Sequence, residues 1–163
     1  MIRIFIADEH FIVRRGLEYL IAGQPDMTLV GEAGTGEEAI EAALAGGIDV
    51  LVLEVALPGK NGVAVTREIR RVCPGVHVLV FTAHTQETFA VRALEAGAAG
   101  YLAKDSGADE LAAAIRAVAR GEHHVSDVIV KRLEAGHGNK RSLSPMARLS
   151  MREYEIMRLL ASG

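Results

Sequence analysis

The sequence predicts an α/β fold in which helices cover both faces of a parallel β-sheet. Short apolar runs alternate with stretches in which apolar residues recur every three or four positions, the spacing of amphipathic helices. Residues 50–53 read Val-Leu-Val-Leu, a continuous apolar run typical of a strand buried on both faces. With 163 residues, half of them hydrophobic, the chain has room for one ordinary domain and a smaller segment.

The apolar runs predict five strands. They cover residues 2–7, 27–33, 50–55, 76–82 and 100–103. A helix between each pair of consecutive strands makes the strands parallel, so their carboxyl ends meet at one edge of the sheet.

Amphipathic stretches predict five helices that alternate with these strands. Their apolar stripes fall within residues 13–21, 39–44, 65–72, 90–94 and 111–118. Thr35 and Glu38 have the spacing of a capping box at the start of the second helix. Pro74 ends the third helix, and we expect Ser106 to cap the fifth, which stops at Gly121.

The pattern changes after residue 121, so the chain divides into a body (1–121), a helix and linker (122–148) and a final segment (149–163). Apolar residues within 125–133 predict a short helix, and residues 136–148 are basic and contain Gly, Ser and Pro. Ser150 and Glu153 form a second capping box, which opens another helix. A lone helix of this length cannot bury its apolar stripe, so it either docks on the body or begins a further domain.

Charge and composition exclude several classes of protein. Residues 1–120 hold 11 basic and 16 acidic side chains, which argues against a nucleic-acid-binding body. Residues 121–163 hold 7 basic and 5 acidic side chains, which leaves open a tail that leads toward a nucleic-acid-binding part. No apolar run reaches the roughly 18 residues of a membrane span. The single cysteine, Cys73, forms no internal disulfide, which favours a cytoplasmic protein.

Polar side chains lie at the carboxyl ends of four of the predicted strands. They are Asp8 and Glu9, Glu54, Thr82 and Lys104. A single carboxylate in such a position is usually a turn residue or a helix cap, but this complementary set favours a binding site. Clustered carboxylates repel one another unless a cation neutralises them, and oxygen ligands suit Mg²⁺. A hydroxyl and an ammonium opposite a metal are what a phosphoryl group requires.

Residues 1–120 resemble the CheY-like receiver domain of two-component response regulators, of the NarL/LuxR-type subfamily. The resemblance implies a doubly wound five-stranded sheet with strand order 2-1-3-4-5. The segments that carry it are 4–9 and 49–59, Asn61-Gly62, Val80-Phe81-Thr82-Ala83, and 96–105 with its Gly-Tyr-Leu strand and Lys104-Asp105 pair. Residues 149–161 are similar to the first helix of a LuxR-type helix-turn-helix domain, and no recognition helix follows.

The resemblance implies a role for each residue at the strand ends. Asp8 and Glu9 correspond to the acidic pair that binds Mg²⁺, with Ala56 offering its backbone carbonyl and Glu54 completing the metal set. Thr82, Ala83 and Lys104 would contact the phosphoryl group. Tyr101 would be the aromatic switch that turns inward when Thr82 moves. The implied partners are a sensor histidine kinase, a second copy of the receiver domain, and DNA through a complete output domain.

One residue departs from the family pattern, because Glu54 stands where the phosphoacceptor Asp is expected. Its carboxyl lies one methylene further out, which misplaces the nucleophile. Glu54 is therefore either natural, in a regulator that ignores phosphate, or a substitution that imitates the phosphorylated state. If it imitates that state, its carboxylate approaches Lys104 or Thr82 and Tyr101 points inward. Otherwise Glu54 turns to solvent or joins the metal site, and Tyr101 is exposed.

The sequence thus favours a transcriptional response regulator, not an enzyme, that is phosphorylation-impaired or phosphomimetic. A receiver-like protein-interaction module that never contacts DNA is the alternative. A metal-dependent phosphatase is disfavoured, because His10 stands where such enzymes carry a second Asp after the strand-one nucleophile.

Overall fold

A computed structural model describes residues 1–136 as a parallel sheet covered by helices. The strands are β1 (Ile2–Ala7), β2 (Met27–Ala33), β3 (Val50–Leu53), β4 (His77–Thr82), β5 (Gly100–Ala103) and β6 (His124–Val125). The helices are α1 (Phe11–Ala22), α2 (Gly36–Ala45), α3 (Gly62–Val72), α4 (Glu87–Glu95), α5 (Ala108–Ala119) and α6 (Asp127–Gly136). Within the described range, no helix is long and apolar enough to cross a membrane.

The strand order is β2-β1-β3-β4-β5-β6, so the predicted order of the first five strands is confirmed. The predicted count of five strands is wrong, because β6 adds a sixth strand that pairs in parallel with β5. This strand has only two residues, too few to show an apolar period in the sequence. The sheet consequently continues past residue 121, and α6 follows it directly.

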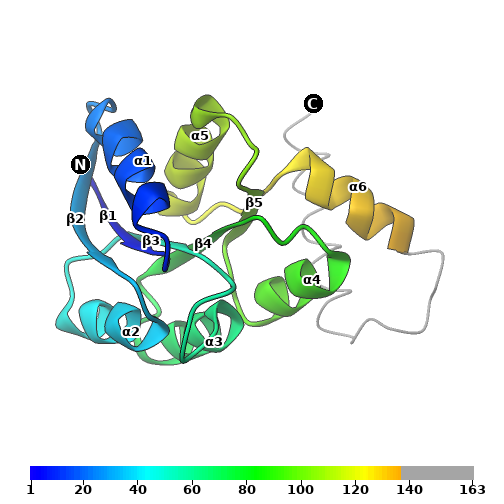
Figure 1. The fold of residues 1–163 in the computed structure, drawn as a ribbon, viewed down its shortest axis with the longest axis horizontal. Coiled ribbons are helices and arrows are strands. Elements are labelled where there is room, and N and C mark those ends of the chain that lie inside the picture. The colour runs from blue at the N-terminus through cyan, green and yellow to red at the C-terminus, as the bar shows by residue number, and fades with distance from the viewer. Residues whose placement is uncertain (137–163) are drawn as a thin grey trace.

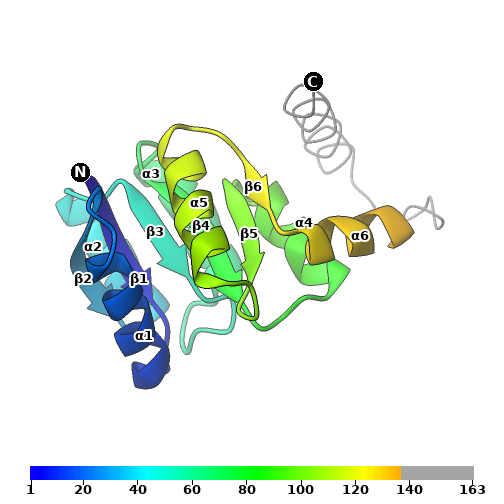
Figure 2. The same ribbon diagram turned by 90° about the horizontal axis from the view of Figure 1, so that it is seen from above.

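Helices cover both faces of the sheet (Figures 1 and 2). Alternate side chains of the strands enter one of two apolar layers. On one face, α1 and α5 pack on Ile4, Val52 and Leu79. On the other face, α2, α3, α4 and α6 pack on Leu51 and Val80. With both faces buried, the polar side chains that follow the strands are confined to the sheet's edge.

The ends of several elements show how local sequence sets the fold. Thr35 caps α2 by accepting the amide of Glu38, and the Glu38 carboxylate accepts the amide of Gly34, as expected for a capping box. The expected cap of α5 at Ser106 is wrong, because the N-cap residue is Gly107 and no side chain bonds there. The third strand ends at residue 53, so Glu54 lies in the loop beyond it.

An ion pair joins α5 to the loop between α1 and β2. The Arg116 guanidinium donates to both carboxylate oxygens of Asp26, at 2.7 and 2.8 Å, and to the side-chain oxygen of Gln24 at 2.7 Å. These hydrogen bonds lower the pKa of Asp26 to about 2. This ion pair therefore links α5 to the loop that follows α1 through a charged contact at the surface.

The stability that Asp26 contributes should depend on acid pH. Its pKa in the folded chain lies below the ordinary value of 3.8, so the contribution is complete above that pH and is lost as the pH falls toward about 2. We expect Arg116→Met to lower the thermal unfolding midpoint near neutral pH, and the gap from the parent chain to close below pH 3.8. A gap that stays constant between pH 6 and pH 2 contradicts this assignment.

Candidate functional site

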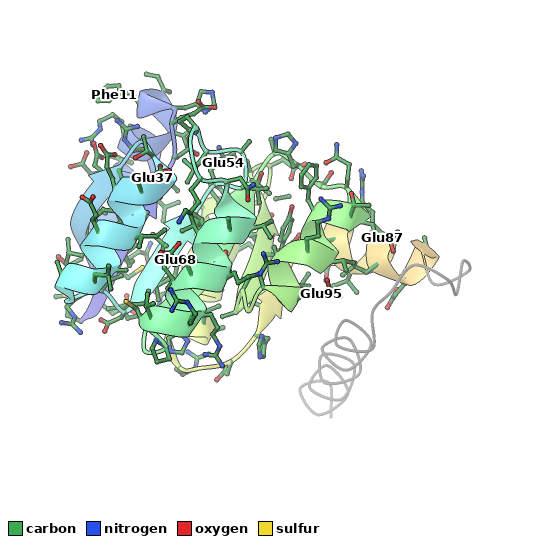
Figure 3. The ribbon with its side chains drawn as sticks, turned by 90° about the horizontal axis from the view of Figure 1, so that it is seen from below. Phe11, Glu37, Glu54, Glu68, Glu87 and Glu95 are labelled. Carbon is green, nitrogen blue, oxygen red and sulfur yellow. The ribbon has the colours of Figure 1, made fainter. Side chains whose placement is uncertain are left out.

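The strand-end side chains gather at the carboxyl edge of the sheet. Four parallel strands, β1, β3, β4 and β5, are consecutive in the sheet. The residues at their carboxyl ends therefore meet at this edge. Asp8, Glu54, Thr82 and Lys104 form one bonded cluster, which we call the acidic site. In Figure 3, Glu54 lies near the start of α3, toward the same end of the molecule as Phe11 at the start of α1.

Glu54 is held by three different groups. Its Oε1 accepts the Thr82 hydroxyl at 2.5 Å and the backbone amide of Ala56 at 3.0 Å, and its Oε2 lies 2.7 Å from the Lys104 Nζ. Only 5 % of its side chain is exposed. A buried carboxylate must be paired and hydrogen-bonded to keep its charge, and both oxygens of Glu54 are satisfied.

Lys104 places one ammonium between two buried carboxylates. Its Nζ donates to the Asp8 carboxylate at 2.5 Å as well as contacting Glu54. Burial opposes the charge of Lys104, but the hydrogen bonds and the charges of Asp8 and Glu54 outweigh it and raise its pKa. One cation thereby offsets the repulsion between the two carboxylates.

The backbone around Asp8 is fixed by a residue that the sequence did not reveal. Arg14, one turn into α1, donates to the carbonyl oxygens of Asp8 at 2.7 Å and Glu9 at 3.3 Å. The amide of His10 donates to the Asp8 carboxylate at 2.8 Å. Neither role has a sequence signal, because the carbonyls and the amide belong to the backbone.

A glycine allows the loop after Glu54 to fold back against α3. A Cβ at Gly62 would lie 2.5 Å from the Glu54 carbonyl oxygen and 2.7 Å from the Val55 Cα. The amide of Gly62 donates to the carbonyl of Val55 at 2.8 Å. The first residue of α3 therefore requires glycine for the backbone to pass this close to Glu54.

Tyr101 points into the protein and is fully buried. Its hydroxyl donates to the carbonyl of His84 at 2.5 Å, and the amide of His84 donates to the Thr82 Oγ1 at 3.1 Å. Burial and the negative charge of Glu54 raise the pKa of the Tyr101 hydroxyl. Of the two arrangements left open by the sequence, the structure has Glu54 on Lys104 and Thr82 with Tyr101 inward.

Two of the predicted site residues lie at the margin of this cluster, and a third joins it through its backbone amide. The Glu9 side chain is 43 % exposed, and its carboxylate lies 3.9 Å from the His10 Nε2. Ala83 is exposed directly after Thr82, and Ala56 contributes its amide to Glu54. The roles predicted for all three remain predictions.

The acidic site has oxygen donors that suit Mg²⁺, but its arrangement does not fit a metal shared by Asp8 and Glu54. The Lys104 ammonium already contacts both carboxylates, and both Glu54 oxygens are bonded. Within residues 1–136, no three His, Cys, Asp or Glu side chains are grouped to hold a metal ion. In this arrangement, the cation that offsets the charges of Asp8 and Glu54 is the Lys104 ammonium.

This combination of a doubly wound sheet, an acidic strand-end site and a buried tyrosine defines a signal-receiving domain. The family model for the response regulator receiver domain matches residues 4–116. The chain is 32 % identical to the response regulator UvrY of Escherichia coli K12 over 164 residues, which cover all of this chain and 75 % of UvrY. It is 35 % identical over 167 residues to the transcriptional regulatory protein LiaR of Bacillus subtilis, covering all of this chain and 78 % of LiaR.

Solved structures agree with these relatives. A crystal structure of a LuxR-family two-component response regulator from Aurantimonas matches with a TM-score of 0.80 and 36 % identity, covering 84 % of this chain and 98 % of that one. The receiver domain of the regulator NarL from Mycobacterium tuberculosis matches with a TM-score of 0.72 and 32 % identity, covering 74 % and 98 %. The chain belongs to the response regulator family of two-component systems, with relatives of the NarL/LuxR type.

Removing the Lys104 ammonium should strongly destabilise the fold. Lys104→Met leaves two buried carboxylates facing each other, and breaking a buried ion pair in this way costs about 3 kcal/mol or more of unfolding free energy. Urea unfolding at pH 7 measures the loss. Adding Glu54→Gln to this variant should recover part of it, because one of the two buried charges is then removed.

Lys60→Met is the matched control. Lys60 pairs with Glu68 on the surface, where both side chains are about one third exposed, so its loss should cost less than about 1 kcal/mol. If Lys104→Met costs no more than Lys60→Met, the ammonium does not hold the acidic site together.

Proposed function

We propose that this response regulator acts on transcription and that Glu54 occupies its phosphoacceptor position. In this proposal Glu54 is phosphorylation-impaired and partly replaces the phosphoryl group. The observation that carries the proposal is the contact of the Glu54 carboxylate with Thr82 and Lys104 while Tyr101 is buried. Those two side chains are the ones expected to contact a phosphoryl group in the receiver domains that this chain resembles.

The geometry of Glu54 supports impaired phosphorylation. Its side chain is longer than that of Asp by one carbon–carbon bond, about 1.5 Å. A misplacement of about 1 Å costs on the order of 10²-fold in rate, because in-line transfer requires an aligned nucleophile. Each Glu54 oxygen also carries a hydrogen bond or an ion pair that must break before the oxygen can attack.

The charge of Glu54 supports partial imitation of a phosphoryl group. A carboxylate offers two acceptor oxygens and one negative charge, whereas a phosphoryl group offers three oxygens and more charge. The two oxygens of Glu54 reach both Thr82 and Lys104, which satisfies the main polar partners. We therefore expect a switch that is biased toward the active arrangement and insensitive to phosphate donors.

The proposal extends to the organisation of the chain and its partners. Residues 1–121 are the receiver domain, residues 122–148 a helix and linker, and residues 149–163 the first helix of a LuxR-type output domain; residues 137–163 lie outside the described range. The expected partners are a sensor histidine kinase, a second receiver domain, and DNA contacted by a complete output domain. The expected location is cytoplasmic.

Intact-mass spectrometry after incubation with a small acyl phosphate and Mg²⁺ tests the proposal. We expect no mass gain for the parent chain, because Glu54 misplaces its carboxyl. The shortened variant Glu54→Asp should gain one phosphoryl group. The control Glu54→Ala, which has no carboxyl at this position, should gain none.

Two results contradict the proposal. One is a stoichiometric phosphoryl group on Glu54 of the parent chain. The other is a Glu54→Asp variant that stays unmodified while folded, because side-chain length would then not be what impairs the site.

A further inference from the structure

Helix α6 belongs to the same apolar layer as Tyr101. Ile129 is fully buried, Leu133 is 3 % exposed, and both lie in one core cluster with Tyr101 and with Ala90 and Ala93 of α4. Figure 2 shows α6 continuing from β6 and lying beside α4, and α6 also contacts β5. The helix therefore packs over the strand that carries Tyr101.

Strand β6 brings α6 to this position by pairing closely with β5. Tyr101 is in register with Val125, so their side chains lie next to each other on the same face of the sheet. A Cβ at Gly100 would lie 2.6 Å from the His124 carbonyl oxygen, so only glycine permits the two strands to approach this closely. The backbone amide of Ser126 then donates to the Tyr101 carbonyl at 3.0 Å.

Hydrogen bonds connect the acidic site to the first turn of α6. The first part runs from the Glu54 carboxylate through the Thr82 hydroxyl to the amide of His84. The carbonyl of His84 accepts the Tyr101 hydroxyl, and the Tyr101 carbonyl accepts the amide of Ser126. The bonds from Glu54 to the Tyr101 hydroxyl run through side chains and the loop after β4. The bond to Ser126 belongs to the backbone pairing of β5 with β6, which places the start of α6 beside Tyr101.

We propose that α6 is the element that senses the position of Tyr101, and that it stays docked on α4 and β5 only while Tyr101 is inward. The proposal uses the Glu54–Thr82 contact described above, but it does not depend on whether Glu54 replaces a phosphoryl group. Because α6 precedes residues 137–163, its docking connects the acidic site with the rest of the chain. The occupant of this face of the receiver is thus the chain's own helix.

Packing supplies the physical reason for this coupling. The Tyr101 ring is enclosed by the layer that includes α4 and α6, so a ring that leaves its buried position leaves a cavity beside these helices and removes packing contacts from them. Val125 is its neighbour on β6, and Ile129 lies one turn into α6. Coupling between two such positions is reciprocal, so undocking α6 must also release Tyr101.

One buried polar group next to the docked helix α6 lacks a hydrogen bond within the described residues. The hydroxyl of Ser126 is buried and has no hydrogen-bond partner within the described residues. A buried polar group without a partner weakens the state that contains it.

Amide hydrogen exchange on the full chain tests the coupling from the acidic site to α6. Thr82→Ala removes the hydroxyl that joins Glu54 to His84, so the amides of Ser126 and Val130 should exchange about tenfold faster or more. Thr66→Ala is the matched control: Thr66 is also fully buried, but its hydroxyl bonds Gly62 within α3. We expect this control to leave both amides within about twofold of the parent rate.

The variant Ile129→Ala tests the coupling in the opposite direction, from α6 to Tyr101. It weakens the docking of α6 and leaves the residues of the acidic site unchanged. Fluorine NMR of protein labelled with 3-fluorotyrosine, with the signal assigned by Tyr101→Phe, should show the Tyr101 ring becoming solvent-accessible. Ile21→Ala, an equally buried truncation in α1 on the opposite face, should not shift this signal.

The coupling is overturned if Thr82→Ala leaves the Ser126 and Val130 amides at the parent rate. It is also overturned if Thr66→Ala accelerates them equally, which would show a global loss of stability. An unchanged Tyr101 signal in Ile129→Ala refutes the reciprocal step. Phosphate takes part in neither measurement, so these outcomes are independent of whether Glu54 can be phosphorylated.

Discussion

The ammonium of Lys104, placed between the buried carboxylates of Asp8 and Glu54, is the interaction on which the site depends. Two carboxylates that are 3 % and 5 % exposed repel each other strongly unless a cation lies between them. The parallel sheet makes this possible, because it brings the ends of β1, β3 and β5 to one edge. Once Lys104 holds one oxygen of Glu54, the other oxygen faces the Thr82 hydroxyl, and this contact fixes the start of the loop after β4.

The same contact connects the acidic site with the loop after β4 and with Tyr101. Thr82 holds the amide of His84, the carbonyl of His84 holds the Tyr101 hydroxyl, and Tyr101 lies under α4 and α6. A carboxylate that is part of the protein thus supports an arrangement that receiver domains of this kind are expected to reach by phosphorylation. The chain is a response regulator, and in the function proposed above its acidic site works without a phosphoryl group.

Much of this organisation could be predicted from the sequence, because strand and helix periods and the residues after each strand are local signals. They indicated that Asp8, Glu54, Thr82 and Lys104 would meet. The sixth strand was missed because two residues carry no period. The connecting role of His84 has no sequence signal because it uses only backbone atoms. The Arg14 guanidinium bonds backbone carbonyls, which any residue could offer, so its role has none either. Whether Glu54 would turn to Lys104 or to solvent depended on tertiary geometry.

We propose that the Glu54 carboxylate holds Tyr101 inward. Crystal structures of the parent chain and of Glu54→Ala, grown under the same conditions without a phosphate analogue, test it most directly. We predict that the Tyr101 hydroxyl lies within hydrogen-bonding distance of the His84 carbonyl in the parent chain, and that in Glu54→Ala Thr82 moves and the ring turns toward solvent. A buried Tyr101 that still bonds His84 in Glu54→Ala would contradict the account, because the inward position would then not depend on Glu54.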